Sequence, residues 1–411
     1  MVRLVMQIVC TGVALRAVPR VLQSTAAEWG RSGPIPHWTT VRLWMQRLGH
    51  AVLTAAKEHA EDWAWLVDHS VQIGQDKCLV ILGIRLAALP PPGTALVASD
   101  LELIALVPRP SWTAPEVDAT LQKAVAEAGV PRVIVDDHGG DLTGGVQLFQ
   151  ERHPETLEVY DIGHKAACVL ERRLESDPRW PEFQRQVGQT RCAIQQTELA
   201  FLVPPGPRPK ARFMNLEPLL AWGRKVVGIL EAPSAEVLGW VSVERLHEKL
   251  GWLLDLRDGL DKWSQWQAVV DAVVGFVNCR GLDRGAARDL IAALPGSLRA
   301  SSRSLAAELV RFVRSESSQA RPEERLPGST AVLESCFGKF KALEKEHARG
   351  GFTGLVLALG AFLAEATKET IVDAFAASHT QDVWDWCREN LGTTLFGKRK
   401  LAFQEGVTDS G

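Results

Sequence analysis

Acidic residues that directly follow apolar runs are the first candidates for chemistry in this sequence. Asp68 follows the run at residues 63–67, and the pair Asp136 and Asp137 follows the run at residues 133–135. A carboxylate placed just after a buried strand is costly unless it binds something. Open sheets also place ligand sites at the carboxyl ends of their strands. We therefore expect these aspartates to contribute to one site.

Glu334 is the candidate for a third carboxylate. The apolar residues Leu333, Phe337 and Phe340 around it have helical spacing, so we expect a helix here. Glu334 and Lys341 fall on the neighbouring stripe of that helix. In this arrangement the carboxylate could face a metal ion while the lysine faces a phosphate.

Two aspartates and one glutamate suit a pair of Mg²⁺ or Mn²⁺ ions. Mg²⁺ prefers oxygen ligands and keeps several waters, and two ions about 4 Å apart serve phosphodiester chemistry. Because neighbouring strand residues point to opposite faces, only one of Asp136 and Asp137 is expected to reach such ions. His138, Asp161 and His164 could lie around the site, and structural roles stay open for all three.

The elements that would position these residues follow the order β-β-β-α-β-α-β. Helices are expected at about 114–128 and 142–152, and strands at 63–67, 78–84, 101–107, 133–135 and 157–160. This order predicts an α/β fold with a mixed sheet and helices on its faces. Residues 165–325 show no convincing strand runs and predict a helical region.

The first 60 residues carry seven basic and two acidic side chains, a net charge of +5. A loop at residues 30–36 separates two helical stretches, and Thr39 or Thr40 could cap the second. The side chains of this second helix that could contact DNA phosphates and base edges are Thr39, Thr40, Arg42 and Arg47. The pattern predicts a helix-turn-helix, and an ordinary helical hairpin with a solvated basic face is the alternative.

Composition excludes several protein classes. The chain has 411 residues, 46% hydrophobic and 23% charged, which suits two or three globular domains. Its seven cysteines are scattered and form no C-x-x-C pair, which argues against a disulfide framework or zinc finger and for a reducing compartment. No apolar run is long enough to span a bilayer, and the first 15 residues do not predict a signal peptide. We expect a cytoplasmic protein with no membrane partner.

Several blocks of the sequence resemble bacterial insertion-sequence transposases of the DDE class, which are built on an RNase H-like core. The blocks that carry the resemblance are residues 65–70 (WLVDHS), 77–83 (KCLVILG), 134–142 (IVDDHGGDL), 160–165 (YDIGHK) and 332–339 (VLESCFGK). The resemblance implies an RNase H-like mixed sheet interrupted by a helical insertion and preceded by a helix-turn-helix. The implied domains are a DNA-binding region at 1–58, the first part of the core at 59–175, the insertion at 176–326 and helices completing the core at 327–411.

The resemblance also implies catalytic roles. Asp68, Asp137 and Glu334 match the family's acidic triad and would be the ligands of two Mg²⁺ or Mn²⁺ ions, with Asp136 as the alternative second aspartate. Asp161 and His164 are similar to an Asp-x-x-His element that some of these enzymes carry.

The implied reaction is hydrolysis of DNA at the transposon ends, followed by transfer of the freed 3′-hydroxyl into target DNA. Further contacts to the double-stranded DNA are expected from Arg208, Lys210, Arg212 and Lys341. A homodimer associated with the bacterial nucleoid is expected. The alternatives are an RNase H-like nuclease without strand transfer and a catalytically inactive, transposase-derived DNA-binding protein.

Overall fold

The protein divides into two compact units. The computed structural model describes residues 1–28, 30, 33–73, 76–206, 216–345, 354–393, 398–399 and 402–403. Unit 1 contains residues 1–161 and 326–411, and unit 2 contains residues 162–325. Residues 1–58, expected as a separate DNA-binding region, thus belong to the same unit as the sheet. The segment 162–175, expected in the core, belongs to unit 2.

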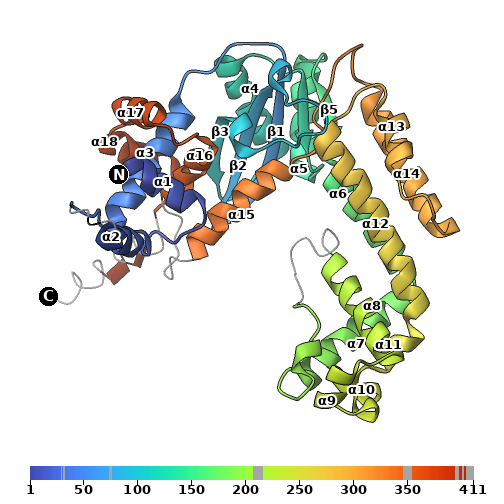
Figure 1. The fold of residues 1–411 in the computed structure, drawn as a ribbon. Helices are drawn as coiled ribbons and strands as arrows, with labels where there is room; N and C mark the ends of the chain where they lie inside the picture. Colours follow the sequence, from blue (N-terminus) through green and yellow to red (C-terminus); the bar gives the residue numbers. More distant parts are fainter. Residues whose placement is uncertain are drawn as a thin grey trace. The chain divides into compact units, whose positions relative to one another are not determined.

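Unit 1 contains a mixed sheet of five strands in the order β3-β2-β1-β4-β5 (Figure 1). The strands are β1 (Trp63–Ile73), β2 (Asp76–Arg85), β3 (Glu102–Arg109), β4 (Val133–Asp136) and β5 (Leu157–Tyr160). β2 runs antiparallel to β1 and β3, whereas β4 runs parallel to β1 and β5. The predicted α/β fold with a mixed sheet is confirmed. The central strands are continuous apolar runs because both of their faces are buried.

Helices α4 (Ala114–Ala128) and α5 (Gly140–Arg152) cover one face of this sheet. α4 begins where we expected it, because the side chains of Thr113 and Glu116 form a reciprocal cap at its first turn. The core between the helices and the sheet is built from Trp63, Trp65, Val67, Leu79, Ile81, Ile134, Leu121, Val146 and Phe149. Residues 65, 67 and 134 therefore point toward α4 and α5.

Helix α15 (Ala331–Lys345) packs against β1 (Figure 1). The stripe predicted from the sequence, Leu333, Phe337 and Phe340, is buried in this contact region of unit 1. Two short 3₁₀ helices, η1 (Leu86–Ala88) and η2 (Ala98–Asp100), connect β2 to β3.

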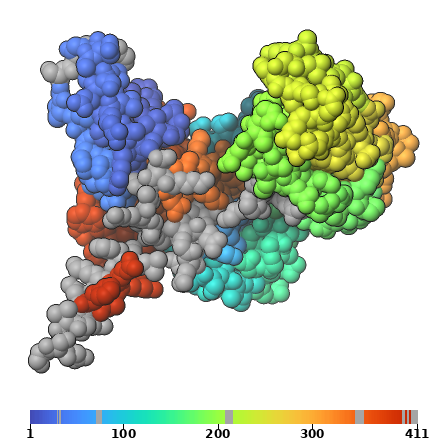
Figure 2. Space-filling model, turned by 90° about the horizontal axis from the view of Figure 1, so that it is seen from below, coloured from blue at the N-terminus to red at the C-terminus, as the bar shows by residue number. Residues whose placement is uncertain are grey.

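The N-terminal helices pack with the C-terminal helices of unit 1 (Figure 2). The N-terminal ones are α1 (Val2–Cys10), α2 (Val18–Glu28) and α3 (Trp38–Thr54); the C-terminal ones are η4 (Gly354–Leu357), α16 (Ala358–Leu363), α17 (Lys368–Ala377) and α18 (Thr380–Asn390). α3 is the centre of this group and contacts η4, α16, α17, α18 and the edge strand β3.

This packing does not confirm a helix-turn-helix. A recognition helix must leave one face free for the DNA groove, but Met45, Gln46, Leu48 and His50 of α3 are all buried and lie on different sides of the helix. The expected cap is also wrong. His37 precedes the first turn and its Nδ1 accepts a hydrogen bond from the backbone N–H of Thr39, so Thr39 and Thr40 lie inside the helix.

The regular elements of unit 2 in the described residues are helices, joined by turns and loops. Its elements are α6 (Ile162–Glu175), α7 (Arg179–Ile194), η3 (Ala200–Leu202), α8 (Glu217–Glu231), α9 (Ala235–Trp240), α10 (Val243–Leu250), α11 (Trp252–Asp255), α12 (Arg257–Arg280), α13 (Ala286–Ala293) and α14 (Ala300–Ser317). Trp180, Phe183 and Trp263 form an aromatic centre, with Trp180 and Trp263 packed edge to face at 5.0 Å between ring centroids. None of the described helices of either unit is both long and apolar enough to cross a membrane.

Candidate functional site

Two of the expected ligands lie near the point where the pairing of β1 with β4 ends: Asp68 within β1 and Asp137 just after β4. The parallel pairing of these strands has Leu66 and Val135 as its last aligned pair. Asp68 and Asp137 each follow two residues later, Asp137 just past the end of β4. Asp68 is buried and Asp137 is half-buried, and the Asp137 Oδ1 accepts a hydrogen bond of 2.9 Å from the Gly139 N–H.

We expected Asp68 to follow the end of its strand, but it lies within the strand. β1 continues along β2 to Ile73, with an irregular register between Asp68 and Val71. The apolar run of the sequence stops at residue 67 because β4 ends beside it and the strand leaves the covered part of the sheet. Asp68 thus lies where β1 extends beyond its parallel neighbour, which is the place where open sheets bind ligands.

The pleat separates Asp68 from Asp136. Val67 points into the core under α4 and α5, so Asp68 points to the opposite face. Ile134 points into the same core as Val67, and alternation then gives Asp136 the same face as Ile134. Asp137 follows the last residue of β4, so this alternation does not fix its direction, and its place beside Asp68 stays a prediction.

Glu334 lies on the exposed side of α15, and Lys341 is half-buried on the same helix. Because α15 packs against β1, the helix that carries Glu334 contacts the strand that carries Asp68. The carboxylates of Asp68, Asp137 and Glu334 do not, however, all come within 4.8 Å of one another. In the described residues, only one set of three His, Cys, Asp or Glu side chains has its ligand atoms this close together.

That set consists of Asp136, His138 and Glu158. The His138 Nε2 lies 3.3 Å from the Glu158 Oε1, and the Asp136 Oδ1 accepts a hydrogen bond of 2.6 Å from the His138 N–H. The His138 ring stacks on Tyr160, with 4.1 Å between centroids and 5° between planes. β4 and β5 hold this group together, because their register aligns Asp136 with Tyr160 and Ile134 with Glu158.

Asp136 is the buried member of this group, with 0% of its surface exposed. Burial and the nearby Glu158 carboxylate raise the pKa of Asp136 to about 8, although the hydrogen bond from the His138 N–H opposes the shift. Its Oδ2 has no hydrogen-bond partner in the described structure. Two neighbouring carboxylates and an imidazole in this environment could hold a metal ion.

Sequence reasoning placed Asp136 and His138 near the site but missed Glu158. The available signal was an acidic residue inside the short apolar run 157–160, where a strand with two covered faces would carry a valine or isoleucine.

Asp161 makes a structural contact, which the sequence left open, and the role of His164 stays a prediction. Asp161 is buried at the end of β5, and its Oδ1 accepts a hydrogen bond of 2.8 Å from the Thr330 N–H just before α15. This contact joins the two segments of unit 1 that flank unit 2. His164 lies in α6 of unit 2.

His69, next to Asp68, contributes to the polar surroundings of this end of the sheet. Its Nε2 lies 3.1 Å from the Asp141 Oδ2, and its ring lies 5.3 Å from that of Trp112. Burial lowers the pKa of His69, while the carboxylates of Asp141 and Asp137 oppose this shift.

The expected DNA-binding residues differ in their availability. The Arg47 guanidinium donates 2.8 Å hydrogen bonds to the carbonyl oxygens of Ser378 and Phe375 and lies 4.3 Å from the Phe375 ring centroid, so it binds the end of α17 instead of facing solvent. Arg42 is half-buried. Thr39 is exposed and Thr40 half-buried at the first turn of α3. The remaining candidates, Arg208, Lys210 and Arg212, lie outside the described residues.

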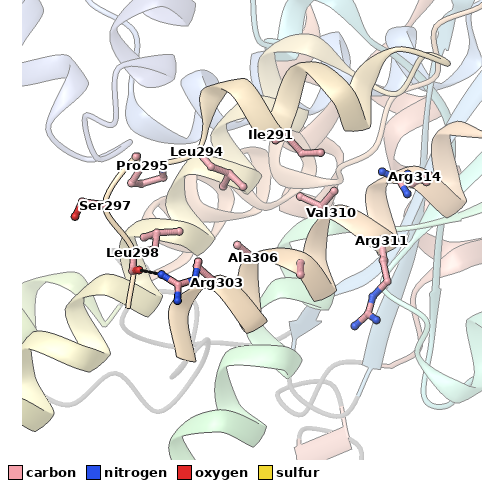
Figure 3. A pocket seen from close by; sticks show the side chains of 12 residues that line it. Ile291, Leu294, Pro295, Ser297, Leu298, Arg303, Ala306, Val310, Arg311 and Arg314 are labelled. Carbon is pink, nitrogen blue, oxygen red and sulfur yellow. Dashed lines mark hydrogen bonds between the residues drawn. The ribbon is translucent and has the colours of Figure 1, made fainter. Parts of the chain in front are cut away.

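A pocket of about 680 Å³ in unit 2 lies between α13 and α14 (Figure 3). Its lining is apolar on one side, with Ile291, Leu294 and Val310, and Arg303 donates a hydrogen bond of 2.7 Å to the Leu298 carbonyl oxygen (Figure 3). Its lining residues include no carboxylate, so it is not a candidate for metal-dependent chemistry.

Comparisons with known proteins give no match, so the inference of function depends on the residues described above. Neither the protein-family models nor the curated proteins include one that matches this chain.

Proposed function

We propose that this protein is a DDE-class transposase with an RNase H-like core, acting on DNA phosphodiesters with Mg²⁺ or Mn²⁺. The observation that supports this most is that Asp68 and Asp137 each lie two residues beyond Leu66 and Val135, the last aligned pair of the parallel strands β1 and β4. The strand order β3-β2-β1-β4-β5, with β2 antiparallel to its neighbours, agrees with the core that the sequence resemblance implies.

Asp68, Asp137 and Glu334 would be the metal ligands. Two bound divalent ions would activate the attacking oxygen and stabilise the leaving oxygen of an in-line displacement. Each ion needs only a few carboxylate oxygens because water and substrate phosphate complete its coordination. The three carboxylates therefore need not lie in mutual contact before metal and DNA bind. Their negative charges would repel one another without the ions.

The reaction we propose has two steps on DNA. In the first, water attacks the phosphodiester at the transposon end and releases a 3′-hydroxyl. In the second, that hydroxyl attacks a phosphodiester of the target DNA, the transposon 3′-oxygen becomes bonded to the target phosphate, and the target strand leaves with its own 3′-hydroxyl. Thr39, Thr40 and Arg42 at the start of α3, Lys341 on α15 and the basic segment with Arg208, Lys210 and Arg212 are the proposed DNA contacts. Arg47 is not among them because its donors are used within unit 1.

A homodimer acting in the bacterial nucleoid belongs to the same proposal. Two rival functions would use part of the same set of residues. A nuclease on this core would cut without joining, and an inactive descendant would bind DNA without cutting. Joined products separate the first rival from a transposase, and any cleavage excludes the second.

The test is an excision and strand-transfer assay with the DNA that flanks the gene. The variants are Asp68→Asn, Asp137→Asn and Glu334→Gln, and the matched control is Glu344→Gln on the same helix. We expect each triad variant to lose more than about 100-fold in rate, since even outer-shell changes at metal sites cost about 10–100-fold. The control should retain activity.

Three other results would change the proposal. Metal-dependent cutting without joined product would favour the nuclease. If Asp137→Asn kept full activity and Asp136→Asn lost it, Asp136 would replace Asp137 as the second metal ligand. DNA binding without cutting by the wild-type protein would favour the inactive descendant.

A further inference from the structure

We propose that Asp136, His138 and Glu158 form a second metal site, which binds one divalent transition-metal ion and prefers Zn²⁺ to Mg²⁺. Nothing in the proposed DNA chemistry requires this site. It lies on the face of the sheet opposite to Asp68, because Asp136 and Glu158 share the face of Ile134.

The separation of the ligand atoms fits one ion. The His138 Nε2 and Glu158 Oε1 lie 3.3 Å apart. Two ligands bound to Zn²⁺ at about 2.0–2.1 Å in tetrahedral geometry lie about 3.3 Å from each other. The ligand atom of Asp136 lies within 4.8 Å of both, so a small movement of its carboxylate would complete three protein ligands.

Asp136 supplies an independent indication of a missing partner. Its side chain is fully buried, yet its Oδ2 accepts no hydrogen bond in the part of the chain that the structure describes. The carboxylates of Glu158, Asp137 and Asp161 all act on it electrostatically. A buried carboxyl group among like charges keeps a proton unless it has a counter-charge, and a divalent cation between Asp136 and Glu158 would displace that proton and provide the counter-charge.

The donor set favours a transition metal. Mg²⁺ selects oxygen ligands in octahedral geometry, whereas an imidazole nitrogen suits Zn²⁺ and its neighbours in the periodic series. The stacking of His138 on Tyr160 fixes the plane of the imidazole, and the pairing of β4 with β5 fixes Glu158. Three protein ligands would leave a fourth position for water.

Binding would join the turn after β4 to the edge strand β5. His138 has a left-handed backbone with φ of 55°, which costs free energy for a residue other than glycine. An ion on its side chain would hold this turn, and with it Asp137, in place. Because the ion would bind only the folded chain, it would also raise the melting temperature of the protein.

The experiment is a Zn²⁺ titration of the full chain after chelation, followed by calorimetry and by metal analysis after dialysis. We expect one Zn²⁺ per chain that is retained in a large excess of Mg²⁺. His138→Asn and Glu158→Gln should each weaken Zn²⁺ binding by at least about 100-fold and remove the rise in melting temperature. Co²⁺ in place of Zn²⁺ should give visible absorption that both variants lose.

His153→Asn and Asp68→Asn are the matched controls and should keep the ion. His153 lies at the end of α5 and contacts Gln122, outside the group. The proposal is overturned if the wild-type chain retains no Zn²⁺, or if His138→Asn and Glu158→Gln retain it as well as the wild type, because the ion would then be bound elsewhere. None of these measurements depends on DNA cleavage, so their outcomes are separate from those of the transposase test.

Discussion

At the residue scale, two buried aspartates show two ways of holding a carboxylate inside this protein. Among the groups with the largest effect on the pKa of Asp136 in unit 1 there is no cation, and its pKa is raised. Asp177, between α6 and α7 of unit 2, receives hydrogen bonds of 3.0–3.1 Å from Arg179, Lys262 and Trp263. Burial alone would raise the pKa of Asp177, but these donors lower it well below its ordinary value. The surroundings of Asp136 favour the binding of a cation, whereas Asp177 already has cationic partners.

Replacing Asp177 should destabilise unit 2. Asp177→Ala leaves Arg179, Lys262 and the Trp263 indole without their shared acceptor, so we expect a loss of about 3 kcal/mol or more in the free energy of unfolding. The matched control is Asp258→Ala, because Asp258 pairs with Arg179 from an exposed position and should cost less than about 1 kcal/mol. Urea unfolding followed by helical circular dichroism measures both. Equal costs for the two variants would contradict this view of Asp177.

The same residue gives a pH dependence with a defined sign. Because its pKa is lower in the folded than in the unfolded chain, Asp177 stabilises the protein fully above the ordinary value of 3.8. This stabilisation is lost as the pH falls below about 4. The difference in stability between the wild type and Asp177→Ala should therefore shrink in acid and be constant from pH 6 to 8.

At the element scale, the close approach of α3 to the C-terminal helices is the reason why the structure does not confirm the helix-turn-helix prediction. A Cβ added at Gly49 would lie 1.6 Å from the Leu357 carbonyl oxygen, and one added at Gly360 would lie 2.7 Å from the Gly49 carbonyl oxygen. The local sequence predicts a helix here but contains no signal for partners 300 residues away. Arg47 was a reasonable DNA contact from its position and is instead bound to α17.

Gly49→Ala tests this approach of two backbones. The methyl group would force α3 and η4 apart, and we expect a loss of about 3 kcal/mol in stability. Gly275→Ala is the matched control, because a Cβ there meets nothing within 4 Å and alanine is the better helix former by up to about 1 kcal/mol. The control should melt slightly higher than the wild type. A Gly49→Ala protein with unchanged unfolding would show that the helices can separate without cost.

Elements that depend on local pattern were the ones that the sequence predicted well. The capped helix α4 and the short strand β5 have the predicted bounds. β1 and β2 were predicted too short because their hairpin extends beyond the region that the helices cover. The group of Asp136, His138 and Glu158 could not be predicted, since Glu158 meets the other two only through the register of β4 with β5.

At the scale of the whole molecule, unit 2 is one continuous segment inserted into unit 1. Asp161 is the last residue of unit 1 before the insertion, and it binds the Thr330 N–H shortly after the insertion ends. The chain therefore leaves and re-enters unit 1 at neighbouring points. Each unit has its own apolar core, with Trp65 and Phe149 in unit 1 and Phe183 and Trp263 in unit 2. Insertions of this kind are tolerated when the ends lie close together at the surface of a domain that folds by itself.

Replacing residues 162–325 by a short Gly/Ser linker should thus leave unit 1 folded. A few flexible residues can join Asp161 to the segment before Thr330, because the hydrogen bond between them already brings their ends together. We expect a cooperative thermal transition and retention of the Zn²⁺ site, since Asp136, His138 and Glu158 all lie in unit 1. The control exchanges α15 for the same linker, which removes the buried Phe337 and Phe340 and should abolish the cooperative transition. If the protein without unit 2 also failed to melt cooperatively, the sheet of unit 1 would depend on the inserted helices for its stability.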